Sequence, residues 1–128
     1  MSEYESLIQE AEAEAAQDRC KEAYLLLGRA LTIGGADDWR CRYLRGVYAL
    51  RVASTRLDRA ESLAEPGIVL VKAGCWLSRS EAYLTSAADL ASGDEQAEIF
   101  ERLTGMRREQ DRFRQLWWRT PVNASRFG

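Results

Sequence analysis

The sequence predicts an all-α fold of stacked antiparallel helices, and three observations support this prediction. The 128 residues include only 2 prolines and 9 glycines, which favours long regular elements over many short strands and turns. Apolar residues recur at helical spacing in the two longest predicted segments. The phrase EAYLLLGRALTIGG at 22–35 is nearly repeated as EAYLTSAADLASGD at 81–94. We therefore expect one domain over 1–119, built from two related three-helix units at 4–64 and 66–118.

The repeat extends beyond this phrase. A gapless alignment of 21–46 with 80–105 gives 8 identities in 26 positions, where average composition predicts about 2. Both copies open with a Glu, place a Tyr–Leu pair on the buried side, and then reach Gly34 or Gly93, where we expect left-handed helix caps. The identical pairs are Glu22/Glu81, Ala23/Ala82, Tyr24/Tyr83, Leu25/Leu84, Leu31/Leu90, Gly34/Gly93, Leu44/Leu103 and Gly46/Gly105.

Capping and breaking residues set the expected helix boundaries. Asp37 and Asp38 stand where an N-cap for the third helix belongs, and Asp94 does so for the last. The sequence Glu-Pro-Gly at 65–67 breaks the chain, and Pro66 suits the first turn of the next helix. Six helical segments are expected, at about 4–17, 20–34, 38–64, 66–77, 80–92 and 94–118.

The third and fourth segments differ in how clearly they predict a helix. The segment GIVLVKAG at 67–74 is rich in β-branched residues and would suit a strand equally well. No second strand of comparable quality exists to pair with it, so a buried helix is expected. The third segment carries an apolar stripe at helical spacing, formed by Trp39, Tyr43, Val47, Leu50, Leu57 and Ala64.

The first two segments resemble those of tetratricopeptide-type helical repeat proteins over residues 11–30. Ala11 stands 12 residues before Ala23, and Ala23-x-x-x-Leu27-x-x-Ala30 matches the second-helix signature of that family, with Leu27 in place of its usual Phe. The internal period of 59 residues differs from the family's 34. The resemblance implies a scaffold of stacked antiparallel helices that binds peptides or protein partners.

The sequence contains no histidine, which narrows the possible chemistry. This absence removes the commonest general base, the Ser–His and Cys–His nucleophile pairs, and the commonest transition-metal ligand. Glu10 with Glu14, or Glu98 with Glu101, stack on helix faces and are the remaining candidates for holding a hard cation. Carboxylates at such spacings are usually solvated helix surface, so no enzymatic activity, metal or cofactor is expected.

The three cysteines, Cys20, Cys41 and Cys75, are widely spaced and form no C-x-x-C pair. We expect them to be small buried apolar residues in a reducing compartment. The first residues are acidic and polar, unlike a secretory signal, and the longest apolar stretch is too short to span a bilayer. A cytoplasmic protein without membrane contact is therefore expected.

The charges are unevenly distributed along the chain. Residues 1–18 hold six acids and no base, whereas 102–128 hold seven arginines against Glu109 and Asp111. Such a chain can join head to tail with another copy or fold so that its two ends neutralise each other, and the third alternative is that the two charged segments are simply solvated helix faces.

The last helical segment is the most suggestive for function. A heptad-like seam carries Ile99, Leu103, Met106, Gln110, Phe113 and Trp117, and a second stripe carries Phe100, Arg107, Arg114 and Trp118. A helix with two apolar aspects is either sandwiched inside the fold or has one aspect facing a partner. The tail that follows, 120–128, is expected to be mobile unless a partner fixes it. The candidate partner-binding residues are Phe100, Arg107, Gln110, Phe113, Arg114, Trp117 and Trp118.

Two functions remain open at this point. The leading hypothesis is a non-catalytic protein–protein interaction module, such as an adaptor, small chaperone or assembly subunit, that associates with itself. The alternative is a nucleic-acid-binding accessory subunit that uses the arginine faces of 40–59 and 102–119, with Trp117 or Trp118 stacking on bases.

Overall fold

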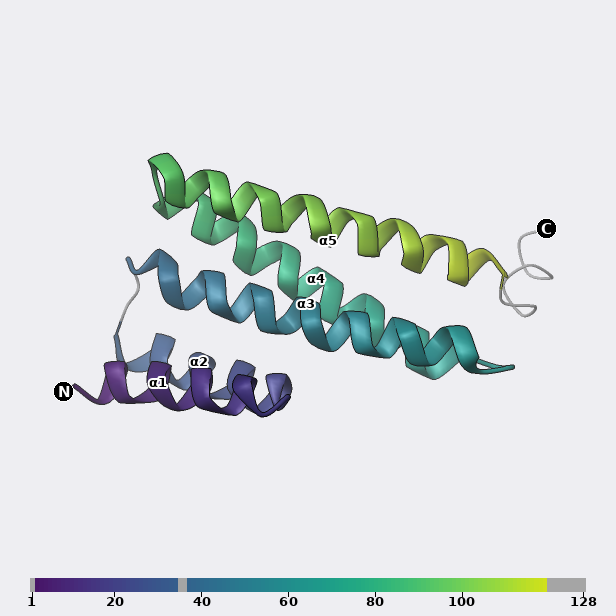
Figure 1. Ribbon diagram of the computed structural model, residues 1–128, viewed down its shortest axis with the longest axis horizontal. Coiled ribbons are helices and arrows are strands. Elements are labelled where there is room, and N and C mark those ends of the chain that lie inside the picture. Colours follow the sequence, from purple (N-terminus) through teal and green to yellow (C-terminus); the bar gives the residue numbers. More distant parts are fainter. Residues whose placement is uncertain (1, 35–36, 120–128) are drawn as a thin grey trace.

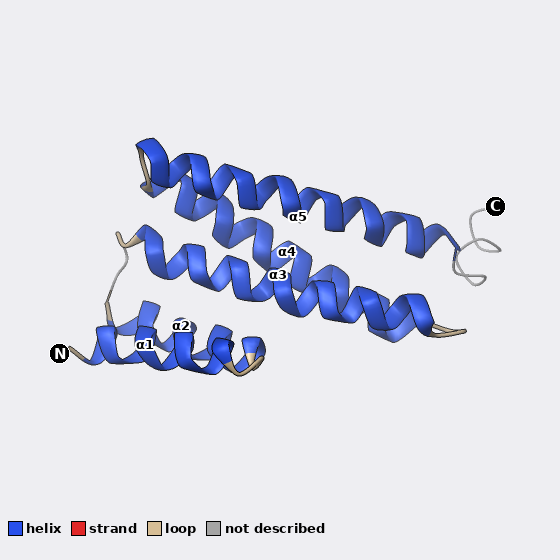
Figure 2. Cartoon of the chain, in the orientation of Figure 1, coloured by secondary structure: helices blue, strands red, loops and turns tan. Residues whose placement is uncertain are grey.

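The protein consists of helices packed side by side, as the computed structural model shows for residues 2–34 and 37–119 (Figure 1). No strand occurs within these two ranges, so the predicted all-α fold is confirmed and 67–74 is helical (Figure 2). The expected tail at 120–128 lies outside the described residues. The helices of the described ranges are α1 (Glu3–Ala16), α2 (Cys20–Ile33), α3 (Trp39–Ser62), α4 (Gly67–Leu90) and α5 (Gly93–Arg119).

Helix α3 is the centre of the bundle. It packs against α2, α4 and α5, while α1 packs against α2 and α4 against α5. The short hairpin of α1 and α2 covers the N-terminal half of α3, and the α4–α5 hairpin runs along its length (Figure 1). As a result, α1 and α5 lie at opposite edges of the molecule with α3 between them.

The prediction of separate helices at 66–77 and 80–92 is wrong, because α4 is continuous over Gly67–Leu90. No glycine or proline separates Leu77 from Glu81, so nothing in the backbone breaks the helix there. Ser80 is fully buried, and its Oγ donates to the carbonyl of Gly46 at 2.8 Å. The second of the two expected units therefore contains two helices rather than three.

The two predicted glycine caps behave differently from each other. Gly34 is the C-cap of α2 and its N–H donates to the Ala30 carbonyl at 3.1 Å, but its φ of 176° is extended rather than left-handed. Gly93 has a left-handed φ of 60°, yet the C-cap of α4 is Ala91, and Gly93 opens α5. Each glycine thus fulfils one half of the expectation, since capping belongs to Gly34 and the left-handed conformation to Gly93.

The predicted cap at Asp38 is confirmed and also ties two helices together. Its Oδ1 accepts from the backbone N–H of Arg40 at 3.0 Å, which satisfies a donor at the start of α3. Its Oδ2 accepts from the hydroxyl of Tyr4 on α1 at 2.5 Å. Burial and this hydrogen bond to a carboxylate raise the pKa of the Tyr4 hydroxyl. The start of α3 is thereby anchored to α1.

Helix α3 is buried on more sides than its predicted stripe implies. Within that stripe Tyr43, Val47 and Leu57 are buried, Trp39 and Leu50 are half-buried, and Ala64 is exposed beyond the helix end. Because three helices surround α3, a second set of small residues is also buried, comprising Gly46, Ala49, Ala53 and Ala60. The small residues let neighbouring helices approach closely.

The two copies of the repeated phrase meet at Arg45. Its guanidinium carbon lies 3.9 Å from the ring centroid of Tyr24 and 4.7 Å from that of Tyr83. Its Nε donates to the Tyr24 carbonyl at 3.1 Å, and its Nη1 donates to the Tyr83 hydroxyl. Gly28 leaves room for this arrangement, since a Cβ there would overlap the Arg45 guanidinium. Each phrase begins in the first helix of a helical hairpin, α2–α3 or α4–α5.

Candidate interaction surface on α5

The first seam of α5 faces the rest of the fold. Ile99, Leu103 and Met106, which form the N-terminal half of the seam, are buried. Gln110, the polar member of the seam, donates from its side-chain amide to the Glu81 carboxylate on α4. The candidate partner residue Gln110 is therefore placed in a contact within the chain.

Two aromatic residues extend this seam towards the end of α5. Phe113 and Trp117 are half-buried, and their rings stack with centroids 5.9 Å apart and planes inclined by 25°. Phe113 lies over Gly74 of α4, where an added Cβ would come within 3.0 Å of its Cζ. Phe113 and Trp117 thus pack against the hydrophobic core from its edge, and Gly74 makes room for the phenyl ring.

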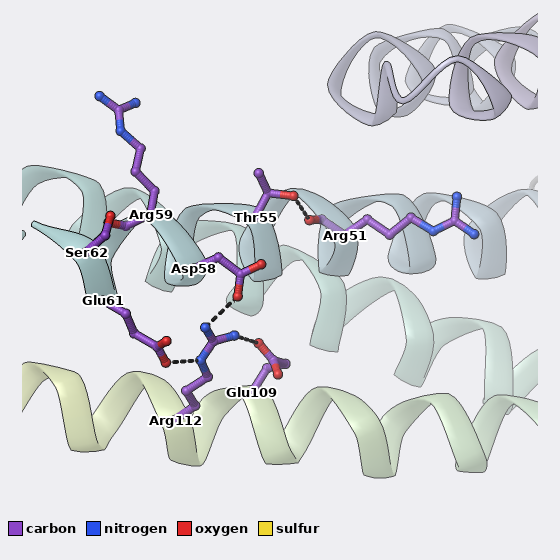
Figure 3. Close-up of polar contacts among 8 residues, drawn as sticks. All are labelled: Arg51, Thr55, Asp58, Arg59, Glu61, Ser62, Glu109 and Arg112. Carbon is purple, nitrogen blue, oxygen red and sulfur yellow. Dashed lines mark hydrogen bonds and ion pairs between the residues drawn. The ribbon is translucent and has the colours of Figure 1, made fainter.

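Arg112 fixes α5 to the C-terminal half of α3 (Figure 3). Its Nε donates to Glu61 at 2.7 Å, its Nη2 to Asp58 at 2.5 Å, and its Nη1 to Glu109 at 3.1 Å. The hydrogen bond from Arg112 lowers the pKa of the Glu61 carboxyl, and the same bond raises the pKa of the Arg112 guanidinium. Asp58 and Glu61 of α3 hold this side of α5 in place through Arg112, whereas Glu109 belongs to α5 itself.

The second stripe of α5 remains exposed. Phe100 is 52% exposed and Trp118 is 56% exposed, although both are large aromatic side chains. Arg107 and Arg114 between them are also exposed, and Arg114 Nη1 donates to Asp111 at 2.6 Å. Four of the seven candidate partner residues therefore lie on one accessible face.

Two polar residues complete this stripe into a regular seam. Thr104 and Asp111 occupy the intervening positions and are exposed as well. Sequence reasoning missed both, because a search for apolar residues does not register a threonine or an aspartate. The signal that identifies them is the spacing of 4, 3, 4, 3 and 4. We call the full set the outer seam, formed by Phe100, Thr104, Arg107, Asp111, Arg114 and Trp118.

The outer seam lies along an edge of the molecule. Gln110 and Phe113 belong to the side of α5 that contacts α4, and Arg112 to the side that contacts α3. The outer seam is formed by other residues, and α5 itself lines an edge in Figure 1. Helix packing within one chain leaves this side of α5 accessible.

Within the residues that the structure describes, no ion pair links the acidic N-terminal helix to the basic C-terminal helix. Glu12 of α1 pairs with Arg40 at 2.8 Å, and Glu14 pairs with Arg19 at 3.5 Å. None of the ion pairs within 2–34 and 37–119 joins α1 to α5. The expectation that the two ends neutralise each other is therefore not met within the described part of the chain.

A separate basic groove lies where the α1–α2 turn meets α3. Its volume is about 330 Å³ and its basic lining residues are Lys21, Arg51, Arg56 and Arg59, with Asp18 and Glu22 also present. In the portion of the chain that the structure covers, no ion pair engages these arginines, and the Nε of Arg56 is buried without a hydrogen-bond partner. Figure 3 shows Arg59 pointing away from α5.

The cysteines only partly follow expectation. Cys20 and Cys41 are buried, and burial raises the pKa of the Cys41 thiol. Cys75 is exposed on α4, so its predicted burial is wrong.

The described ranges contain neither a metal-binding cluster nor a membrane-spanning helix. No group of three or more residues suited to hold a metal ion occurs there. No helix among those ranges has the length and apolar character needed to cross a membrane.

Comparisons with known proteins give no relatives: no family model, no curated protein and no solved structure matches this chain. The resemblance to tetratricopeptide-type repeats stays a prediction. Four residues carry this resemblance, and all are fully buried: Ala11 on α1, and Ala23, Leu27 and Ala30 on α2.

Proposed function

We propose that this chain is a non-catalytic protein–protein interaction module that associates with a second copy of itself through the outer seam of α5. One observation carries the proposal: Phe100 and Trp118 are each more than half exposed on one seam of one helix. Aromatic residues and arginine are the types enriched at the energetic centres of protein interfaces. The outer seam combines two of each with a heptad spacing suited to pairing with another helix.

The physical basis is the hydrophobic effect acting on the two aromatic side chains. A fully buried aromatic side chain removes roughly 150–250 Å² from water, and Phe100 and Trp118 are each about half exposed. Arginines between the aromatic residues keep the seam hydrated when the chain is alone. The role this supports is that of an assembly subunit or adaptor, in which one helix edge is used for contact.

Light scattering after gel filtration tests the proposal directly. We expect the mass of the wild-type protein to rise with concentration towards that of a dimer. The variant Phe100→Ser with Trp118→Ser should remain monomeric. Leu25→Ser is a matched control, because Leu25 is 55% exposed but lies on α2. A wild-type protein that stays monomeric at every concentration and ionic strength would contradict the proposal.

A second candidate function is nucleic-acid binding, and the basic groove is the observation that favours it. Arginines without ion-pair partners can contact phosphates, and such contacts weaken steeply as salt is added. We expect any binding of labelled oligonucleotides at low salt to be lost in Arg51→Gln with Arg59→Gln. Binding that is equally strong in this variant, or no binding by the wild type, would remove this candidate.

A further inference from the structure

The outer seam is complementary to itself when one copy of α5 runs in the opposite direction. Heptad positions in an antiparallel pair face each other symmetrically about a central point. With that point at position 109, aromatic residues face each other at both ends of the seam, and opposite charges face each other at its centre. The facing pairs are Phe100 with the partner's Trp118, Thr104 with the partner's Arg114, and Arg107 with the partner's Asp111, and each pair occurs twice.

We infer that two copies of this chain pair their α5 helices antiparallel, with a two-fold axis near position 109. This inference rests on the proposed self-association and adds to it the orientation and register of the two helices. Aromatic pairs would close both ends of the interface, and two ion pairs would lie at its centre. An isologous interface of this kind is closed, so association stops at the dimer.

Charge disfavours an in-register parallel pairing of the same seam. In a parallel pair Arg107 would face the partner's Arg107, Asp111 the partner's Asp111, and Arg114 the partner's Arg114. Like charges placed opposite each other across an interface are strongly unfavourable. The antiparallel register instead places each Arg107 against a carboxylate.

The residues at the centre of the seam are accessible for these contacts. No hydrogen bond or ion pair within 2–34 and 37–119 engages the Arg107 side chain. Asp111 pairs with Arg114, but both side chains are 64% exposed. An exposed pair of this kind contributes little stability, so the Asp111 carboxylate can accept the partner's Arg107 as well.

The interface involves one helix from each copy and is therefore small. Interfaces below about 1,200 Å² of total buried area are typical of weak or transient complexes. We expect a dissociation constant on the order of micromolar, set by aromatic burial at the two ends and tuned by the central charges.

A charge-swap experiment tests the register. Arg107→Glu places a carboxylate opposite the partner's Asp111, and Asp111→Arg places a guanidinium opposite the partner's Arg107. Each single variant should therefore dimerise at least about tenfold more weakly than the wild type. An equimolar mixture of the two variants restores opposite charges at all central positions and should dimerise like the wild type.

Arg108→Glu provides the matched control, since Arg108 is exposed, adjacent to the seam and outside it. Helix content measured by circular dichroism confirms that each variant is folded. Single variants that dimerise like the wild type, or a mixture that stays monomeric, would overturn the antiparallel register while leaving self-association intact. A wild-type protein that never dimerises would instead overturn the proposed function, and this inference with it.

Discussion

The rings of Tyr24 and Tyr83 meet edge to face, with centroids 6.0 Å apart and planes inclined by 82°. The two residues occupy the same place in the two copies of the repeated phrase and are separated by 59 positions in the sequence. Edge-to-face contact brings the positive edge of one ring to the negative face of the other. Arg45 lies against both rings, so α2, α3 and α4 converge on one small cluster.

Replacing Arg45 should weaken this cluster. Arg45→Met keeps the apolar stem but removes the cation–π contacts with Tyr24 and Tyr83 and the hydrogen bond to the Tyr24 carbonyl. We expect a loss of about 2 kcal/mol in the free energy of unfolding, measured by urea denaturation. Arg51→Met is the control, because Arg51 is exposed and 5.8 Å from the Tyr48 ring. Equal losses in both variants would contradict the role given to Arg45.

The aligned glycines Gly46 and Gly105 should respond oppositely to alanine. A Cβ at Gly46 would lie 2.7 Å from Leu84 Cγ and 3.1 Å from the Leu84 backbone nitrogen. Relieving these contacts would require the backbone of α4 to shift. Gly46→Ala should cost about 2 kcal/mol through overpacking. No atom lies within 4 Å of a Cβ at Gly105, so Gly105→Ala should gain up to about 1 kcal/mol from helix propensity. Thermal unfolding of both variants gives the comparison, and equal shifts would mean that α3 and α4 are not in close contact at Gly46.

The Arg112 cluster should make the protein sensitive to acid through Glu61. The hydrogen bond from Arg112 lowers the pKa of Glu61 below its ordinary value of 4.5. The stabilisation is therefore complete above pH 4.5 and is lost as the pH falls through the lowered value in the folded state. Glu61→Gln should lower the melting temperature at neutral pH, and this difference should shrink at acid pH.

The control for this experiment is Glu101→Gln, which makes the same charge change on α5. Glu101 is exposed and takes part in no ion pair within the described ranges. A difference between Glu61→Gln and wild type that stays constant down to the most acid conditions would show that the bond to Arg112 does not depend on Glu61 ionisation.

The three thiols should differ sharply in reactivity. Cys75 is exposed, whereas Cys20 and Cys41 are buried, and only the thiolate form reacts. In the native protein we expect one thiol to react promptly with a chromogenic disulfide reagent and the other two to react only as the chain opens. Cys75→Ser should abolish the prompt phase, and three prompt thiols in the native wild type would contradict the burial of Cys20 and Cys41.

Local signals predicted much of the fold. Helix ends at Gly34 and Asp38 follow from capping chemistry that acts within a few residues. The predicted division of α4 is wrong, because the repeated phrase begins soon after the start of α2 but begins well inside α4. The first case depends on Asp18, which turns the chain with a φ of 64°, and no such turn precedes Glu81.

The site was predictable only in part, because exposure depends on how helices pack. The sequence predicts two stripes on the last helix and assigns Gln110 and Phe113 to the first of them, but it does not show which stripe is buried. The link from Arg112 to Glu61 joins residues 51 positions apart, and no local pattern encodes it. The spacing places Thr104 and Asp111 between Phe100 and Trp118, and the exposure of those two aromatic residues shows that this face is accessible.

Disulfide trapping tests the central claim most directly, because it reports which positions of two α5 helices are neighbours. In a Cys75→Ser background, chains carrying Thr104→Cys would be mixed with chains carrying Arg114→Cys and oxidised gently. In the antiparallel dimer these two positions face each other, whereas the two copies of position 104 are about 15 Å apart along the axis. We predict disulfide-linked heterodimers of the two chains. Linked pairs of Thr104→Cys chains, or no linkage at concentrations where the protein is dimeric, would contradict the account.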